Sequence, residues 1–141
     1  MAQRLQEIMT PDPVTVSRSS GLVEAARRMR EADVGDVIVV DGDRPIGIAT
    51  DRDLVVRGVA AEAGLADLTI EDVCTTGLVS AGPDDSVDDA AALMRQHAVR
   101  RLVVMDGDRL VGVVSIGDLA IEEDEDSVLA EISSAAGEGG R

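Results

Sequence analysis

The chain has 141 residues, enough for one compact domain or two closely associated half-domains around a real hydrophobic core. It contains no Phe, Tyr or Trp, and 28 acidic against 13 basic side chains give it a net charge of −15. The negative charge repels nucleic acids and anionic membranes, and no aromatic ring can stack on a base, so we expect neither partner. A small anion remains compatible with a local arginine cluster, because salt screens distant charges within about 8–10 Å.

Cysteine usage and the absence of long apolar runs indicate the compartment. The single cysteine, Cys74, excludes an intramolecular disulfide and fits a reducing environment. Residues Met1–Glu7 show no apolar run of the kind found in signal peptides, and no stretch approaches the ~20 apolar residues of a membrane span. We therefore expect a soluble, cytoplasmic protein.

In chain order, the first half predicts a strand, a helix and a hairpin. Val14–Val16 reads as a short strand, and apolar residues recur at helical spacing over Leu22–Met29. The continuous β-branched run Val37–Val40 is typical of a strand covered on both faces. It is followed by an Asp41-Gly42-Asp43 turn, whose Asp-Gly pair tolerates positive φ, and by a return strand at Ile46–Ala49. A second helix is then predicted to follow.

The second half repeats this order, because the chain aligns with itself without gaps at a shift of 65 residues. The alignment places Ile8–Val55 on Val73–Ala120. The predicted elements of the second half are the helix opened by Ser86, the strands Leu102–Met105 and Val111–Val114, and a final helix. A unit of this size rarely buries its apolar face alone, so we expect the two copies to pack on each other and to form clefts between them.

The remaining segments connect and end the two copies. A short capping-box turn at Thr69–Asp72 leads into the second copy, and Arg4–Met9 is the matching segment before the first. This predicts a first repeat at residues 5–68, a second at 69–121, and an acidic, partly disordered tail at 122–141. The acidic run Glu122–Asp126 reads first as a solvated helix start, and binding of a basic partner or a metal is the alternative.

The residues that could bind a ligand lie where the last strand of each copy meets its helix. Gly47–Asp53 and Gly112–Asp118 share one pattern: Gly, two apolar residues, a hydroxyl, two variable positions and Asp. A hydroxyl beside unpaired N–H groups at a helix N-terminus can hold a phosphate oxygen, and an aspartate one turn later can accept hydrogen bonds from a ribose diol. The same pattern is also a plain capping box, worth about 0.5–2 kcal/mol of helix stability. Both interpretations stay open, and they are compatible.

The paired copies resemble the tandem CBS domain, or Bateman module. The resemblance extends from about Leu5 to Ile121 and rests on the element order, the two Asp-Gly turns and the two hydroxyl-x-x-Asp signatures. It implies an α/β (α+β) fold of two pseudo-twofold-related β-α-β-β-α repeats forming one module. It also implies a regulatory role, with AMP, ATP, S-adenosylmethionine or NAD as the ligand class and no obligatory cofactor.

The resemblance assigns roles to individual residues. Asp53 and Asp118 would hold the ribose and Thr50 and Ser115 the phosphate. The backbone around four valines would line the adenine slots: Val14 and Val34 in one site, Val79 and Val99 in the other.

The two sites differ in charge. The repeat alignment places Gly35-Asp36 opposite Arg100 and Arg101, where the family often presents basic residues to ligand phosphates. A unit charge at ~4 Å is worth roughly 1–4 kcal/mol near a surface, so phosphorylated ligands should fill the Ser115 site first. Arg52 partly offsets this at the other site, and ion pairing of Arg100 and Arg101 with nearby acids is the plain alternative.

We therefore expect a ligand-sensing regulatory protein that is not an enzyme, forms a homodimer through its helical faces, and acts on an unknown regulated protein. Two alternatives remain. One is a structural adaptor that docks on an enzyme or transporter without a small ligand. The other is an enzyme with a metal site built from the acidic C-terminal segment and His97. Cys74 aligns with Met9, which favours a packing role over nucleophilic catalysis.

Overall fold

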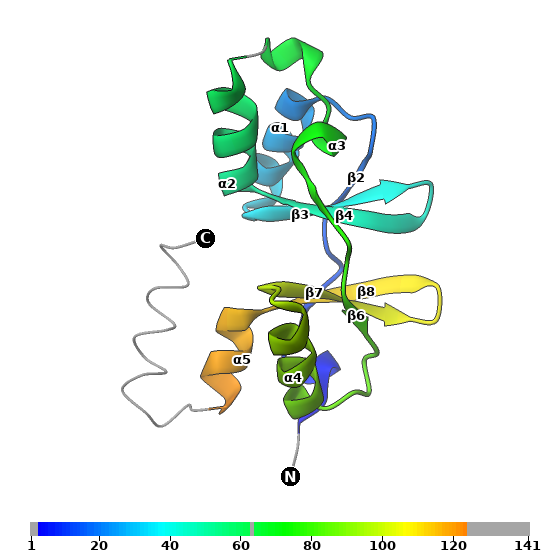
Figure 1. The fold of residues 1–141 in the computed structure, drawn as a ribbon. Coiled ribbons are helices and arrows are strands. Elements are labelled where there is room, and N and C mark those ends of the chain that lie inside the picture. The colour runs from blue at the N-terminus through cyan, green and yellow to red at the C-terminus, as the bar shows by residue number, and fades with distance from the viewer. Residues whose placement is uncertain (1–2, 63, 124–141) are drawn as a thin grey trace. The chain divides into compact units, whose positions relative to one another are not determined.

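In the computed structural model, residues 3–62 and 64–123 are described. They form two compact units (Figure 1). The first unit is Val14–Leu78, and the second consists of the residues up to Pro13 together with those from Val79 onward. Each unit contains a four-stranded sheet and helices that pack on it.

The first unit has the strand order β2-β3-β4-β5, in which β2 and β3 are parallel and the other neighbours are antiparallel. Its strands and helices are β2 (Thr15–Ser17), α1 (Leu22–Ala32), β3 (Asp36–Asp41), β4 (Arg44–Thr50), α2 (Asp51–Asp53), α3 (Ile70–Val73) and β5 (Thr75–Thr76). The helix that starts as α2 continues through a π-helical turn at Leu54–Gly58 and a 3-10 turn at Val59–Ala61.

The second unit repeats this arrangement with the order β1-β8-β7-β6, in which β6 and β7 are parallel. Its elements are a 3-10 turn (Leu5–Glu7), β1 (Thr10–Pro11), β6 (Ser80–Ala81), α4 (Val87–His97), β7 (Arg101–Asp106), β8 (Arg109–Ser115) and α5 (Ile116–Glu123). The predicted order of strand, helix, strand, strand, helix is thus confirmed in both units.

The hairpins adopt the predicted turn chemistry. Gly42 and Gly107 have φ values of 65° and 63°, a region that glycine enters without steric cost. Both hairpins also shift register at the same place, between Val39 and Val40 in one and between Val104 and Met105 in the other. Two sequences that agree at only some positions therefore build the same backbone.

Each unit has its own aliphatic core between its sheet and its helices. In the first, α1 buries Leu22, Ala25 and Met29, which recur at helical spacing on the face toward the sheet. Val37 and Val39 of β3 join this core, while Ile38, which points to the other face of the sheet, is also fully buried. Burial on both faces explains why this strand is a continuous apolar run, as the sequence predicted.

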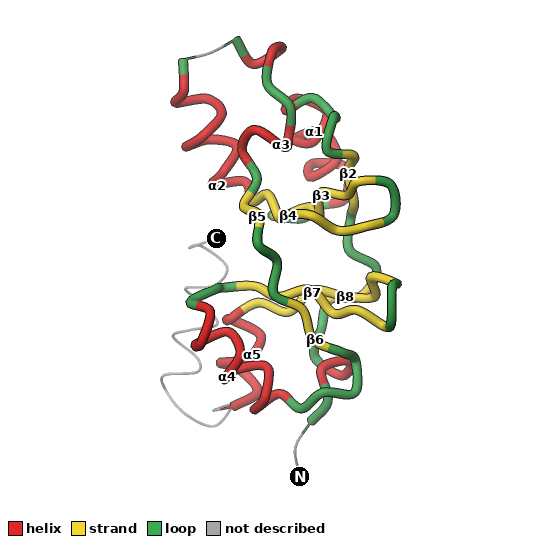
Figure 2. Tube along the Cα trace, turned by 45° about the vertical axis from the view of Figure 1, so that its right-hand side comes forward, coloured by secondary structure: helices red, strands yellow, loops and turns green. Residues whose placement is uncertain are grey.

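The first segment of each predicted repeat packs in the other unit. Leu5 is fully buried in the core of the second unit, and β1 pairs with β8 there. Conversely, Ile70 and Val73 of α3 lie in the core of the first unit, and β5 pairs with β4, as Figure 2 shows. Packing therefore divides the chain after residues 13 and 78, whereas the sequence predicted repeats at 5–68 and 69–121.

The structure bears on the predicted acidic tail and on the predicted absence of a membrane span. Of the acidic tail predicted at 122–141, only Glu122 and Glu123, at the end of α5, lie within the described residues. Among the described helices, none combines the length and the apolar character needed to cross a bilayer.

Candidate functional site

The topology of each unit brings the predicted site residues to one edge of its sheet. Because β2 and β3 are parallel, they start at the same edge, and the antiparallel β4 ends there. Asp36 at the start of β3 is therefore the register partner of Thr50 at the end of β4. In the second unit the corresponding partners are Arg101 and Ser115. We call residues 33–36 with 50–53 the first junction, and residues 98–101 with 115–118 the second junction.

The two junctions share one backbone geometry. Helices α1 and α4 end in a left-handed residue, Asp33 with φ 55° and Ala98 with φ 53°. The chain then turns into the next strand, and a hydrogen bond closes each junction at 2.9 Å. It runs from the Asp51 N–H to the Gly35 carbonyl in the first junction, and from the Ile116 N–H to the carbonyl of Arg100 in the second. Differences between the junctions therefore come from side chains rather than from backbone path.

Both hydroxyl-x-x-Asp signatures form reciprocal capping boxes. The Thr50 N–H donates to Asp53 Oδ2 at 2.9 Å, and the Asp53 N–H donates to Thr50 Oγ1 at 3.1 Å. Ser115 and Asp118 make the same pair of bonds at 2.9 and 3.3 Å. The capping interpretation is thus confirmed at both sites. The capping bonds leave hydrogen-bonding capacity for a ligand. Each hydroxyl still has its O–H to donate, and each carboxylate can accept further hydrogen bonds.

The expectation of unpaired N–H groups beside the hydroxyl is wrong for the first junction. There the Arg52 N–H, the remaining donor of the first helical turn, donates to Asp51 Oδ1 at 2.8 Å. The side chain of Asp51 thus caps its own helix. In the second junction Ile116 has no such group, and within the described part of the chain the N–H of Gly117 has no hydrogen-bond partner.

The four valines predicted to line adenine slots are half-buried at the same sheet edges. Val14 and Val34 pack against the first core, and Val79 and Val99 against the second. Part of their backbone is already engaged: the N–H groups of Val34 and Val99 each donate to the preceding helix at 3.0 Å. The carbonyls of Val14 and Val79 accept from the neighbouring strands at 2.9 and 3.0 Å.

The charged residues divide unequally between the junctions. Arg100 is exposed and Arg101 half-buried at the start of β7. The first junction holds four aspartates, Asp33, Asp36, Asp51 and Asp53, with Arg52 exposed beside them. Asp33 and Asp51 were not singled out from the sequence, although the repeat alignment sets them opposite Ala98 and Ile116 and so contains the signal.

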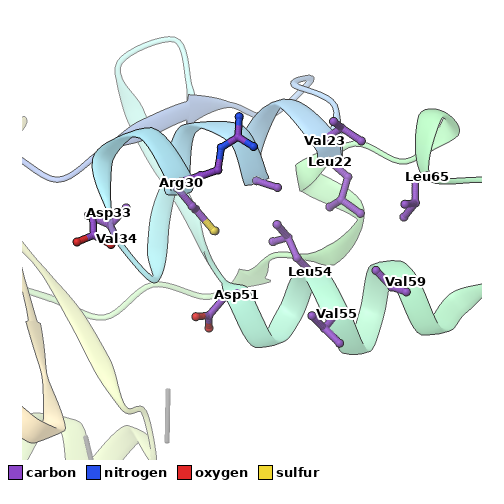
Figure 3. Close-up of a pocket in the computed structure, with 12 residues that line it drawn as sticks. Leu22, Val23, Arg30, Asp33, Val34, Asp51, Leu54, Val55, Val59 and Leu65 are labelled. Atoms are coloured by element: carbon purple, nitrogen blue, oxygen red, sulfur yellow. The ribbon is translucent and has the colours of Figure 1, made fainter. Parts of the chain in front are cut away.

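A pocket of about 450 Å³ opens between α1 and the helix that starts with α2. Figure 3 shows Asp33, Val34 and Asp51 toward one end and Val59 and Leu65 toward the other. Most of its lining is aliphatic, and the exposed side chains there include Val55 and Val59, each 58% exposed. The pocket therefore combines an apolar wall with three charged side chains, Arg30, Asp33 and Asp51.

The remaining candidates do not form a reactive centre. Cys74 is buried in the first core, where burial raises the pKa of its thiol, and its Sγ lies 3.6 Å from the carbonyl of Glu71. A protonated thiol packed in a core is a poor nucleophile, which fits the packing role predicted for it. His97 ends α4 and is exposed. Among residues 3–62 and 64–123, no group of three or more His, Cys, Asp or Glu side chains is placed to hold a metal ion.

Comparison with known proteins agrees with this repeated architecture. The model of the CBS domain matches twice, over residues 5–58 and 70–124. The chain belongs to the CBS domain family. CBS domain-containing protein YhcV of Bacillus subtilis is 38% identical over 119 residues, which cover 84% of this chain and 84% of that protein.

Solved structures of CBS-domain proteins share the fold. Hypoxic Response Protein I, whose crystal structure has two coordinated zinc ions, is 32% identical, with a TM-score of 0.70 over 84% of this chain and 97% of that one. The CBS domain pair of protein MJ0100, in complex with 5′-methylthioadenosine and S-adenosylmethionine, is 23% identical, with a TM-score of 0.75 over 90% of this chain and 100% of that one.

Proposed function

We propose that this CBS pair is a regulatory, ligand-sensing protein that binds an adenosine-containing molecule of the AMP, ATP, S-adenosylmethionine or NAD class. The observation that carries the proposal is the recurrence of a hydroxyl and an aspartate on the same backbone at both junctions. A helix needs a cap, but it does not need the same sheet-edge valines beside that cap in two copies. The adenosine ligands of the MJ0100 pair support the ligand class.

The proposed contacts follow from the hydrogen-bonding capacity left at each junction. Thr50 and Ser115 accept a bond from the helix and keep their O–H for a ligand oxygen. Asp53 and Asp118 use Oδ2 in the cap and can accept ribose hydroxyls on the remaining lone pairs. The valines at the sheet edges supply apolar surface for the base.

We propose sensing rather than catalysis as the role of binding. A ligand that binds only the folded state stabilises it by about 2.7 kcal/mol at a concentration of 100 Kd. Calorimetry and thermal shift of the full chain with AMP, ATP, S-adenosylmethionine, NAD and adenosine test this directly. Mass spectrometry of the purified protein would identify a ligand that it retains. If none of the five binds at millimolar concentration, the proposed ligand class is wrong.

The proposal includes a cytoplasmic homodimer. The apolar wall of the pocket carries side chains that would be covered by self-association: Val23, Val55, Val59 and Leu65, each at least 40% exposed. A closed, isologous contact would bury the same surface on both chains. A CBS-CP12 protein of known structure, with 27% identity and a TM-score of 0.76, is hexameric, and this supports the proposal that the present chain self-associates.

A ligand-independent adaptor is the second candidate, and one observation favours it. Both capping boxes are complete without any ligand, as a purely structural scaffold would require. An adaptor would capture the same partner enzyme or transporter with and without nucleotide, whereas a sensor would change its affinity. The alternative of a metal-dependent enzyme rests on the acidic residues of the C-terminal segment, most of which lie outside the described residues. Its test is whether the protein shows an activity that a chelator abolishes.

A further inference from the structure

We infer that self-association of this chain uses the helices of the first unit and excludes those of the second. The pocket between α1 and the helix that starts with α2 receives the same pocket of a second copy, so that two apolar walls meet. The inference rests on the proposed homodimer and deepens it, because it assigns the contact to one of the two units. The helices α4 and α5 of the second unit have no part in it.

Exposed apolar side chains gather in the first unit. Among the described side chains, five large hydrophobic ones are exposed there, and the second unit has one, Ile116. Four of the five form the apolar wall of the pocket, as Figure 3 shows. At a shift of 65 residues the sequence has Asp88 and Asp124 where this wall has Val23 and Val59. A matching apolar surface that covers the wall releases water from it, and the wall of a second copy is such a surface.

The backbone that carries the wall is fixed by a close contact between helices. Gly58 ends the π-helical turn Leu54–Gly58, and a Cβ built on it would lie 2.5 Å from Leu22 Cδ2 of α1. A side chain at position 58 would displace Leu22, so glycine permits this approach. In the second unit α5 is α-helical over the matching residues 119–123. A π-helical turn often marks a functional surface, and a wall that is already formed is covered at a lower cost in conformational entropy.

Charge separates the two pairs of helices. Helix α1 carries three arginines and two glutamates, and residues 51–61 carry two charges of each sign, so this pair has a net charge of +1. Helices α4 and α5 together contain five acidic residues and one arginine, which gives −4. Because the Coulomb energy scales with the product of the charges, two second units facing each other at equal separation would repel about sixteen times as strongly as two first units.

A contact between the first unit of one copy and the second unit of another is disfavoured for a different reason. It would bring opposite net charges together, but it would also set acidic side chains such as the exposed Asp88 against the apolar wall. The cost of removing a carboxylate from water against valine outweighs a salt-screened attraction at a surface. An isologous contact instead sets valine against valine and closes after two copies.

The test measures the dissociation constant of the dimer for the full chain by analytical ultracentrifugation. Val55→Lys and Val55→Asp should each weaken the dimer about tenfold or more, because like charges then meet in the contact. An equimolar mixture of the two variants should restore the affinity to within about threefold of wild type. Val56→Lys is the matched control, because Val56 is 49% exposed in the same π-helical turn but lies outside the residues that line the pocket. It should change the dissociation constant by less than about threefold.

The wild-type chain gives an independent measurement. A contact made of aliphatic side chains should keep its dissociation constant within about threefold when the ionic strength rises from about 0.05 to about 0.5 M. A contact between a first and a second unit would weaken as salt screens the attraction between them. A contact between two second units would tighten as their repulsion is screened.

The outcomes separate the inference from the proposed function. If the wild-type chain is monomeric at about tens of micromolar, the proposed homodimer fails and the inference fails with it, while adenosine binding is tested separately. If the wild type is a dimer and Val55→Lys dimerises as tightly or more tightly, the inference alone is wrong, because the added cation then faces the acidic second unit. No rescue in the mixture, an equal effect of Val56→Lys, or a wild-type dimer that salt weakens or tightens would also overturn it. Since the salt series uses the wild-type chain, poor folding of a variant leaves the inference open to refutation.

Discussion

Replacing Asp53 by Asn separates ligand binding from helix capping. The Thr50 N–H donates to Asp53 Oδ2 at 2.9 Å, and the side-chain carbonyl of Asn can accept that same bond. The amide group then replaces the second carboxylate oxygen, so an acceptor for the ribose becomes a donor. The cap survives, while the proposed grip on the diol is lost.

The expected size of the effect follows from the bond that is lost. A hydrogen bond to a charged group contributes about 1.5–3 kcal/mol, which corresponds to a loss of affinity of about tenfold to a hundredfold. The cost to the cap is about 1 kcal/mol or less, and the melting temperature without ligand should fall by only a few degrees. Adenosine is the ligand of choice because it carries the diol without a phosphate.

The chain supplies its own control for this experiment. Thr69 and Asp72 form another capping box, in which the Thr69 N–H donates to Asp72 Oδ2 at the same 2.9 Å, at the start of α3 and outside both junctions. Asp72→Asn should therefore change stability as Asp53→Asn does and leave adenosine affinity unchanged. Calorimetric titration and thermal unfolding of both variants measure the two effects separately. If Asp53→Asn binds adenosine as wild type does, or if Asp72→Asn weakens binding equally, the aspartate is a cap and nothing more.

Three further predictions concern packing, assembly and pH. Gly47→Ala should destabilise the first unit by about 1–3 kcal/mol in urea unfolding, because its Cβ would lie 2.8 Å from Cys74 Sγ and 2.9 Å from the Thr75 carbonyl. Gly82→Ala, whose Cβ meets nothing closer than 3.7 Å, should change stability little, and equal effects of the two would contradict the packing argument. The double variant Val55→Glu/Val59→Glu should convert the proposed dimer to a monomer, as measured by light scattering. The dimer would be disproved if the wild-type protein had the mass of one chain at about tens of micromolar, a concentration at which a moderate interface should be occupied. Because burial raises the pKa of Cys74, the thiol's contribution to stability is complete below its ordinary pKa and is lost as pH rises through the higher native value. Its reaction with a disulfide reagent at pH 8 should be much slower in the native protein than in urea.

Most of the fold could be read from the sequence because the signals are local and occur twice. The apolar spacing of Leu22, Ala25 and Met29 predicts α1, and the alignment transfers that prediction to α4. The Asp-Gly turns fix both hairpins for the same reason, since glycine supplies the positive φ. Where a signal was local but single, as in the Ser86 cap, it was also sufficient.

What the sequence could not supply depends on contacts between distant segments. Strands β1 and β5 are two residues long, too short for any alternation to show, and their pairing exists only once β8 and β4 are folded. The exchange of Leu5 into the second core is invisible for the same reason. At the junctions the sequence predicted the capping box but not the hydrogen bond from the Arg52 N–H to Asp51. The carboxylate of an aspartate directly after the cap can accept from several nearby backbone N–H groups, and the sequence does not say which.

The exchanged segments set the order in which the chain can be completed during synthesis. The first unit is contiguous, and every partner it needs has been made once Leu78 has been added. Leu5 instead belongs to a core whose other members include Leu102 and Val114, roughly a hundred residues later, so at ~5–20 residues per second it waits about 5–20 s for them. During that interval Leu5, Ile8 and Met9 have no core to pack in. A cavity-forming substitution at Leu5 would therefore destabilise the C-terminal half of the protein rather than the half in which Leu5 lies in the sequence.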